Sequence, residues 1–190
     1  SMNIVAVRCL METVSPQLGL EYAENFGITT LTSQDLGASQ ALGGLTHGTT
    51  NLELTAAYAS IANEGIYTRP VFFTKILDHD GKILINNEPE THRVLKDSTA
   101  FLLTDAMAGS METNRKFGSS INSTSARANI PGMSNAGKSG TTSKNNDIWF
   151  VGYTPYYTAG IWAGCDSNQK LTAQNGGTSF HKNIWRNIMT

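Results

Sequence analysis

The feature of this sequence that most constrains its fold is a group of three short strand patterns near the carboxyl end. They cover residues 136–142, 147–154 and 157–165. In the middle pattern, Ile148 and Trp149 begin two alternating apolar sets that would take opposite faces of a sheet, because side chains alternate along a strand. We therefore predict an antiparallel meander of three strands, with a site for chemistry on its first strand.

Helical patterns precede these strands, and one more follows them. Apolar residues at three- to four-residue spacing, with polar residues or proline at the starts and glycines at several ends, mark their limits. The expected helices cover residues 4–14, 16–26, 51–63, 97–111 and 179–189, and a β-hairpin is expected at 72–85. Helices first, then an antiparallel meander and a terminal helix, is an α+β order.

Two helix starts carry caps that can be read from the sequence. Ser15 can cap a helix whose first residue is Pro16, a position that proline favours because its missing N–H is not needed there. Thr50 and Glu53 form a capping box, in which each side chain accepts a hydrogen bond from the other residue's backbone N–H. Between helix and strands, residues 114–136 lack periodicity, and so long a loop favours the border of a site.

Composition narrows the functional classes. With 39% hydrophobic and 15% charged residues, the chain of 190 residues can bury a core as one domain or as a large piece of one. The net charge of -1, without a basic block, implies no nucleic-acid partner. Cys9 and Cys165 lack the spacing of metal ligands and are interpreted as buried thiols, so no metal and no cofactor is predicted. No stretch approaches the roughly 20 apolar residues of a membrane span.

The run Gly-Lys-Ser-Gly-Thr-Thr at 137–142 carries the residues that chemistry needs. In an extended strand, Ser139 and Thr141 point to one face, where both hydroxyls can bind one carboxylate, and Lys138 points to the other. Gly140 leaves room for a ligand backbone to pair with the strand. The amide of Thr141 can donate to a developing oxyanion. Taken alone, the run is also compatible with a solvated edge strand that a lysine protects.

The flanking sequence distinguishes these interpretations. Residues 137–142, with Asp-Ile-Trp-Phe-Val-Gly-Tyr-Thr-Pro at 147–155 and the hairpin strand at 159–164, resemble the Lys-Thr/Ser-Gly strand of penicillin-binding protein transpeptidase domains. Upstream, residues 41–67 look like the stretch between the second and third motifs of these enzymes. The chain is most similar to the bifunctional class A kind, and the resemblance covers nearly all of it.

The resemblance implies a role for each matching residue. Ser1-Met2-Asn3 matches the second motif, Ser-x-Asn, so Ser1 would be the proton-relay hydroxyl and Asn3 a ligand of the substrate amide. Lys138 would pass protons and hold charge. The substrate strand would comprise Ser139, Gly140, Thr141 and Thr142, with the hydroxyls of Ser139 and Thr141 on the terminal carboxylate. Two other interpretations stay open, namely that Ser1-Met2 remains from an expression tag and that Asn3 only caps the helix.

The first motif of the family, Ser-x-x-Lys with its nucleophilic serine, has no counterpart in the expected place. Ser179-Phe180-His181-Lys182 has the spacing but lies where the family has its terminal helix. The helical pattern that begins near residue 4 looks like a chain cut inside a domain. We therefore expect residues 1–190 to be the carboxyl-terminal portion of a single transpeptidase domain, inactive without the upstream segment, which would be a second polypeptide or a preceding part of the same one.

By resemblance, the whole domain is a serine D,D-transpeptidase. It would cross-link peptidoglycan stem peptides ending in D-Ala-D-Ala, react with β-lactams and need no cofactor. It would lie on the extracellular face of the bacterial cytoplasmic membrane, anchored by a segment outside this chain. The alternatives are a D,D-carboxypeptidase or β-lactamase-like hydrolase of the same fold, and an N-terminal nucleophile hydrolase in which the α-amine of Ser1 is the base. The last needs residue 1 to open a strand, whereas the pattern after Asn3 is helical.

The remaining titratable residues are interpreted as structural. The four histidines are expected on the surface: His47, His79, His92 and His181. Asp147 could pair with Lys144, but a solvated charge at the start of a strand is the preferred interpretation.

Overall fold

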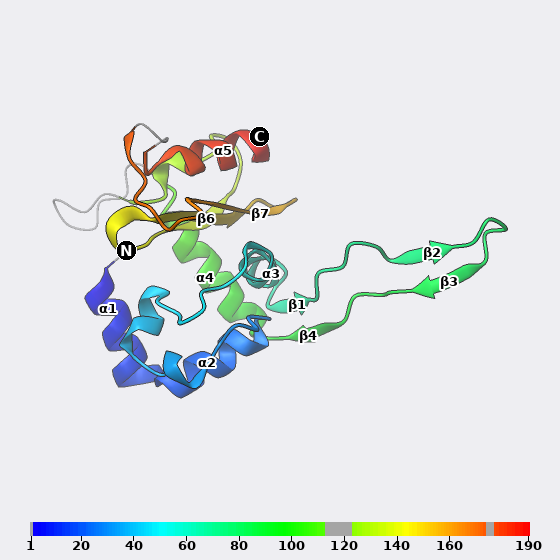
Figure 1. Ribbon diagram of the computed structural model, residues 1–190, viewed down its shortest axis with the longest axis horizontal. Helices are drawn as coiled ribbons and strands as arrows, with labels where there is room; N and C mark the ends of the chain where they lie inside the picture. Colours follow the sequence, from blue (N-terminus) through cyan, green and yellow to red (C-terminus); the bar gives the residue numbers. More distant parts are fainter. Residues whose placement is uncertain (1, 113–122, 174–176) are drawn as a thin grey trace.

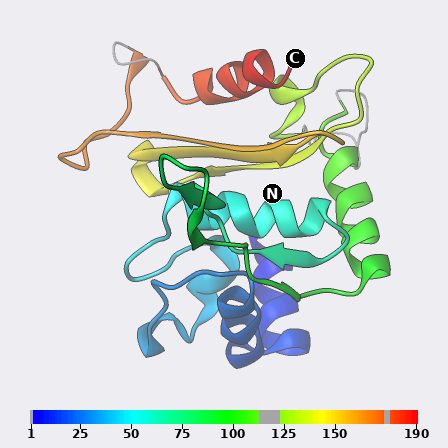
Figure 2. The ribbon, with the colours of Figure 1, turned by 90° about the vertical axis from the view of Figure 1, so that its right-hand side faces the viewer.

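The computed structural model describes residues 2–112, 123–173 and 177–190. A three-stranded sheet separates helix α5 (Phe180–Met189) on one face from α3 (Asn51–Ala62) and α4 (Asp97–Gly109) on the other. Figures 1 and 2 show α1 and α2 as a further layer, beyond α3 and away from the sheet. The predicted α+β class is confirmed, as are the meander and the terminal helix.

The amino-terminal helices break where the sequence predicted. Helix α1 (Asn3–Arg8) continues as a π-helical segment, Cys9–Val14, and α2 (Pro16–Asn25) follows. The Ser15 hydroxyl accepts the N–H of Leu18 at 3.3 Å and so caps α2. The buried residue of α2 is Leu20, whereas Leu18 is 40% exposed.

Helix α3 begins with the predicted capping box. Thr50 Oγ1 accepts the N–H of Glu53 at 3.1 Å, and Glu53 Oε2 accepts the N–H of Thr50 at 3.0 Å. At the same end, the side-chain amide of Asn51 donates to the carbonyl of Gly160 at 3.1 Å. The helix is thereby fastened to the last strand of the sheet.

The sheet is an antiparallel meander in the order β5-β6-β7. Its strands are β5 (Ala136–Thr141), β6 (Asp147–Tyr153) and β7 (Thr158–Gly164). Lys138 lies opposite Val151, and Ser139 lies opposite Phe150. Since directly opposed residues of an antiparallel pair share a face, the register assigns Lys138 and Ser139 to different faces, as predicted.

The core lies on both faces of β6. On the α5 side, Phe150 meets Trp185 edge to face, with ring centroids 5.0 Å apart, and the Trp185 indole donates to the carbonyl of Ala159 at 3.0 Å. On the other side, the hydroxyls of Tyr153 and Thr104 in α4 are hydrogen-bonded at 2.7 Å. Burial of the aromatic rings on both faces explains why the middle strand has two apolar sets of residues.

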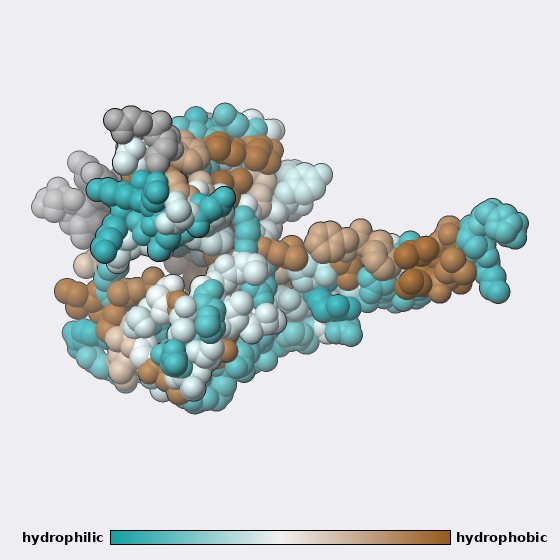
Figure 3. Space-filling view, viewed as in Figure 1, coloured by the Kyte–Doolittle hydropathy of each residue, from teal (hydrophilic) through white to brown (hydrophobic). Residues whose placement is uncertain are grey.

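A β-hairpin projects from the body of the molecule (Figure 1). Strands β2 (Lys75–Leu77) and β3 (Ile83–Asn86) form the hairpin, as predicted. At its base, β1 (Ile66–Thr68) pairs with β4 (Thr91–Arg93), a pairing that the sequence did not indicate. Figure 3 shows hydrophobic residues gathered along this hairpin and also over α1.

Two expectations about the chain as a whole can be compared with the structure. Cys9 is exposed and Cys165 is partly buried, so the interpretation of two buried thiols is wrong for Cys9, which lies on the solvent side of its helix. Across the described ranges, no helix has the length and apolar character that a membrane crossing requires.

Candidate active site

Strand β5 forms an edge of the sheet as far as the chain is described, with β6 as its hydrogen-bonded neighbour. Just beyond its end, the N–H of Thr142 donates to the carbonyl of Asp147 at 3.0 Å. In an antiparallel pair, successive residues turn their backbone groups alternately toward and away from the partner strand. The N–H of Thr141 therefore faces the open edge, where a ligand backbone or an oxyanion can reach it.

Lys138 lies half-buried on the face of β5 opposite to α5, in register with Val151. Its ammonium donates to the carbonyl of Ser139 at 2.6 Å, on the open edge of the strand. Burial lowers the pKa of Lys138, and the nearby ammonium of Lys182 lowers it further. A lysine whose pKa is lowered is better able to exchange a proton near neutral pH than a solvated one.

The hydroxyl of Ser139 is bound by the loop that precedes the strand. Ser139 Oγ lies 3.0 Å from Oγ1 of Thr124. This contact brings the described part of the long loop to the strand, as its length led us to expect. Ser139 is half-buried as a residue, so it is not closed off from solvent.

Gly140 lies directly over an aromatic side chain. A Cβ built on Gly140 would stand 3.3 Å from Cβ of Trp149, its partner in the register. Any larger side chain would press on the tryptophan, so glycine allows the strand to lie flat against its neighbour.

The two threonines at the end of the strand differ. Thr141 is exposed, and its side chain falls on the face of Ser139 by alternation. The hydroxyl of Thr142 is engaged with Asp147: it accepts the N–H of Asp147 at 2.8 Å and donates to Asp147 Oδ2 at 3.2 Å. Thr142 therefore closes the turn after the strand.

The second candidate motif is described only in part. Ser1 lies outside the described residues. Asn3 is exposed and is the first residue of α1; the N-cap position belongs to Met2, which makes no side-chain cap hydrogen bond. The interpretation of Asn3 as a mere helix cap is therefore wrong. A helix at residues 3–8 also disfavours an N-terminal nucleophile hydrolase, which needs a strand there.

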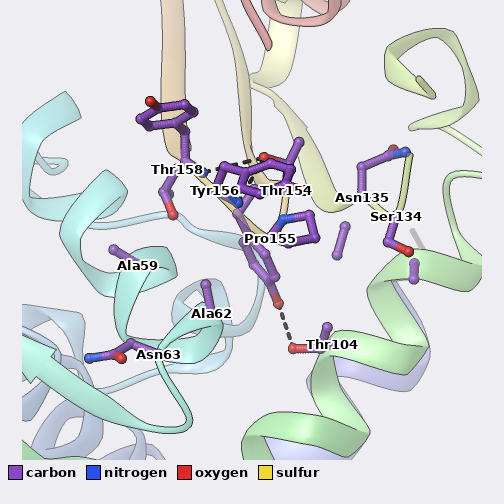
Figure 4. Close-up of a pocket in the computed structure, with 14 residues that line it drawn as sticks. Ala59, Ala62, Asn63, Thr104, Ser134, Asn135, Thr154, Pro155, Tyr156 and Thr158 are labelled. Atoms are coloured by element: carbon purple, nitrogen blue, oxygen red, sulfur yellow. Dashed lines mark hydrogen bonds between the residues drawn. The ribbon is translucent and has the colours of Figure 1, made fainter. Parts of the chain in front are cut away.

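A cavity of the described chain lies apart from residues 138–142. It has a volume of about 420 Å³ and is enclosed by α3, α4, the start of β5 and the turn between β6 and β7 (Figure 4). No charged side chain lines it. Four alanines contribute to its wall: Ala59, Ala62, Ala108 and Ala136.

The interpretation of His181 as a surface residue is wrong. His181 is fully buried and lies four residues before the buried Trp185, a helical spacing that could have indicated it. Asp147 is partly exposed, and its carboxylate is also hydrogen-bonded: Oδ1 accepts the Trp162 indole N–H at 3.1 Å while Oδ2 binds Thr142. Thr124 carried no signal in the sequence, since its contact with Ser139 arises from the fold.

This α+β layering, with a Lys-Ser-Gly-Thr run on an open edge strand, defines the class of domain as penicillin-binding. Comparison with protein families agrees: the model described as "Penicillin binding protein transpeptidase domain" matches residues 3–190. The chain therefore belongs to the penicillin-binding protein transpeptidase family.

Its relatives include proteins of the predicted class A kind. The chain is 33% identical over 190 residues to penicillin-binding protein 1A of Clostridium acetobutylicum, covering 100% of this chain and 22% of that protein. With penicillin-binding protein 1A of Aquifex aeolicus the identity is 34% over 189 residues, covering 100% and 24%. The chain thus spans less than a quarter of the length of these curated relatives.

Solved structures share the fold. The PonA1 protein of Mycobacterium tuberculosis in complex with penicillin V aligns with a TM-score of 0.77 and 24% identity, over 95% of this chain and 50% of that one. Penicillin-binding protein 1A of Haemophilus influenzae aligns with a TM-score of 0.74 and 22% identity, over 95% and 31%.

Proposed function

We propose that this chain is the carboxyl-terminal portion of a serine D,D-transpeptidase domain that cross-links peptidoglycan stem peptides and is acylated by β-lactams. The single observation that carries the proposal is the open edge of β5, which presents the amide of Thr141 and the carbonyl of Ser139 that accepts the Lys138 ammonium. An edge strand can pair with the backbone of a peptide that ends in D-Ala-D-Ala. The complex of PonA1 with penicillin V, a structure that shares this fold, supports β-lactams as ligands.

In this proposal each residue of the site has one task. An upstream serine attacks the carbonyl of the penultimate D-Ala, and the Thr141 amide stabilises the oxyanion that forms. Lys138 and Ser1 transfer the proton from the nucleophile to the leaving amine, and Asn3 binds the substrate amide. Ser139 and Thr141 bind the terminal carboxylate, beside Gly140.

Apolar side chains that stay exposed on this chain support the proposal that an upstream portion of the domain packs against it. On α1, Ile4 is 77% exposed, and on α4, Phe101 is 70% and Leu102 is 66% exposed. The alanine-lined cavity of Figure 4 has the small-residue wall that permits close packing of a further helix. We propose that the segment with Ser-x-x-Lys covers part of this surface and brings the nucleophile to Lys138.

Location and anchoring follow from the same proposal. Stem peptides are cross-linked outside the cytoplasmic membrane, so the domain would act on its extracellular face, held by a segment outside this chain.

The fate of the acyl-enzyme tests the function. We would supply the assembled domain with a stem peptide ending in D-Ala-D-Ala and an amine acceptor, and follow products by mass spectrometry. A cross-linked dimer and released D-Ala are expected. Hydrolysed peptide without dimer would indicate a carboxypeptidase, and no release of D-Ala, with hydrolysis of penicillin, would indicate a β-lactamase-like enzyme.

A further inference from the structure

Asp147 occupies a central place next to the substrate strand. Its backbone and side chain bind Thr142 through several hydrogen bonds, the shortest being Thr142 N–H to Asp147 O at 3.0 Å, Asp147 N–H to Thr142 Oγ1 at 2.8 Å, and Thr142 Oγ1 to Asp147 Oδ2 at 3.2 Å. The second carboxylate oxygen accepts the indole N–H of Trp162, in the next strand, at 3.1 Å. One side chain thus joins the end of β5 to β7 across β6.

The turn that Asp147 closes has an unfavourable backbone. Lys144 and Asn145 have φ of 70° and 59°, the left-handed region that side chains with a Cβ rarely occupy. Such a conformation is costly for a residue with a Cβ and persists where the surroundings enforce it. The hydrogen bonds between Thr142 and Asp147 span this turn, and they hold its two ends together.

A second route runs from Asp147 to the strand through aromatic side chains. The ring of Trp162 lies 6.4 Å from that of Trp149, measured between centroids and tilted by 54°. Trp149 in turn lies beneath Gly140, whose added Cβ would stand 3.3 Å from it. The carboxylate that holds the Trp162 indole therefore also supports the backbone of residue 140.

We propose that Asp147 is a positioning residue of this site, which fixes the backbone of residues 140–142 and with it the oxyanion-binding amide of Thr141. The inference rests on the proposed function for its catalytic meaning, because an amide needs fixing only if charge develops in front of it. Asp147 touches neither substrate nor reacting atoms. Its effect should fall on the rate of acylation more than on the initial binding of a β-lactam.

Variants at three positions separate this role from general stability. Asp147→Ala removes both side-chain hydrogen bonds, whereas Asp147→Asn retains an oxygen for the Trp162 indole and an N–H₂ group for Thr142. Trp162→Phe removes the indole donor alone. Gly164→Ala keeps the Asp147 side chain but disturbs its contact with Trp162. The added Cβ would lie 2.7 Å from the Trp162 ring and 3.0 Å from Asp147 Oδ1. The matched control is Asp105→Ala, the same change at an exposed position of α4.

The first measurement uses this chain by itself and does not depend on catalysis. Amide hydrogen exchange and chemical shifts are followed by NMR for residues 140–142 and for the Trp162 indole. In Asp147→Ala we expect exchange of the Thr142 amide to accelerate about tenfold or more, with a shift of the Thr141 amide resonance. Unchanged exchange and shifts at these residues, in a variant that is folded elsewhere, would overturn the proposal. Should Asp147→Ala fail to fold, Trp162→Phe is judged by the same resonances.

The second measurement is stopped-flow acylation by a fluorescent penicillin in the domain assembled with its Ser-x-x-Lys segment. We expect Asp147→Ala to slow acylation about tenfold or more, since loss of a whole oxyanion donor costs 10²–10³-fold, with a smaller change in the preceding dissociation constant. Asp147→Asn should recover most of the rate, and Asp105→Ala should equal the parent. A parental rate in Asp147→Ala, or an Asn variant as slow as the Ala variant, would contradict the role. If the parent is not acylated, the proposed function fails, and the NMR result alone decides on Asp147.

Discussion

The hydroxyl oxygens of Ser139 and Thr124 lie 3.0 Å apart, which ties the substrate strand to the loop in front of it. Ser139 donates its single O–H to Thr124 here, so binding a substrate carboxylate together with Thr141 is expected to turn that O–H from Thr124 to the ligand. A hydrogen bond to a charged group contributes about 1.5–3 kcal/mol, so losing one should cost roughly ten- to a hundredfold in acylation efficiency.

The first prediction concerns that carboxylate. In the assembled domain, Ser139→Ala and Thr141→Val should each lose preference for a penicillin with a free carboxylate over its ester, because each removes one donor. Thr142→Val should slow both compounds alike, since its hydroxyl binds Asp147 and not the ligand. Acylation rates for acid and ester are compared across the three variants. If all three discriminate as well as the parent, carboxylate binding lies elsewhere.

The second prediction concerns Lys138. Lys138→Ala should lower the acylation rate of the assembled domain by about two orders of magnitude, the range for losing a positioned charge or proton-transfer partner. Lys82→Ala, in the exposed hairpin far from the strand, is the control and should acylate at the parental rate. An unchanged rate in Lys138→Ala would mean that β5 is not the catalytic strand.

The third prediction concerns the capping box of α3. Burial would raise the pKa of Glu53, but hydrogen bonds from Thr29 and Thr50 outweigh it and lower the pKa to about 2. Thr50→Ala removes the cap and should reduce the free energy of unfolding by about 1 kcal/mol, measured by urea titration. Thr99→Ala, on the first turn of α4, is a control that makes no cap. Equal stability of Thr50→Ala and the parent would show that the capping box does not stabilise the fold.

The fourth prediction is a pH dependence of stability from His181. Burial lowers the pKa of His181 to about 4, and Lys182 adds to the shift. In the unfolded chain the imidazole has a pKa near 6.5 and binds a proton below that pH, whereas in the folded chain His181 stays neutral until a lower pH. The contribution of His181 to the free energy of unfolding is therefore fully present above pH ~6.5, and it is lost as the pH drops from ~6.5 through about 4.

Thermal midpoints between pH 7 and 4 measure this effect. The thermal midpoint of His181→Leu should decrease less than that of the parent as the pH falls. The midpoint of His79→Leu, a change at the exposed hairpin tip, should decrease as much as that of the parent. A parental slope in His181→Leu would refute the assignment.

Much of the fold could be predicted because its signals are local. The caps at Ser15 and Thr50 and the spacing of the three strands specify elements by residues close together in the sequence. The β1–β4 pair escaped prediction because it joins three-residue strands across more than twenty residues, with the whole β2–β3 hairpin between them.

The site shows the same division. The sequence indicated Lys138 to Thr142 as a strand because the run is contiguous. It could not indicate Thr124, or the double contact of Asp147 with Thr142 and Trp162, because these depend on which loops and strands become neighbours. The roles of Ser1, Asn3, Lys138 and the strand residues in catalysis stay predictions.

The central claim is that this chain supplies the Lys-Ser-Gly-Thr part of a site whose nucleophilic serine lies on an upstream Ser-x-x-Lys segment. Intact-mass spectrometry after incubation with penicillin tests it most directly, with this 20.5 kDa chain alone and assembled with that segment. We predict no adduct on the isolated chain and, in the assembly, one adduct on the serine of the upstream segment. A stoichiometric adduct on any serine of this chain, Ser1 above all, or no adduct in the assembly, would contradict the account.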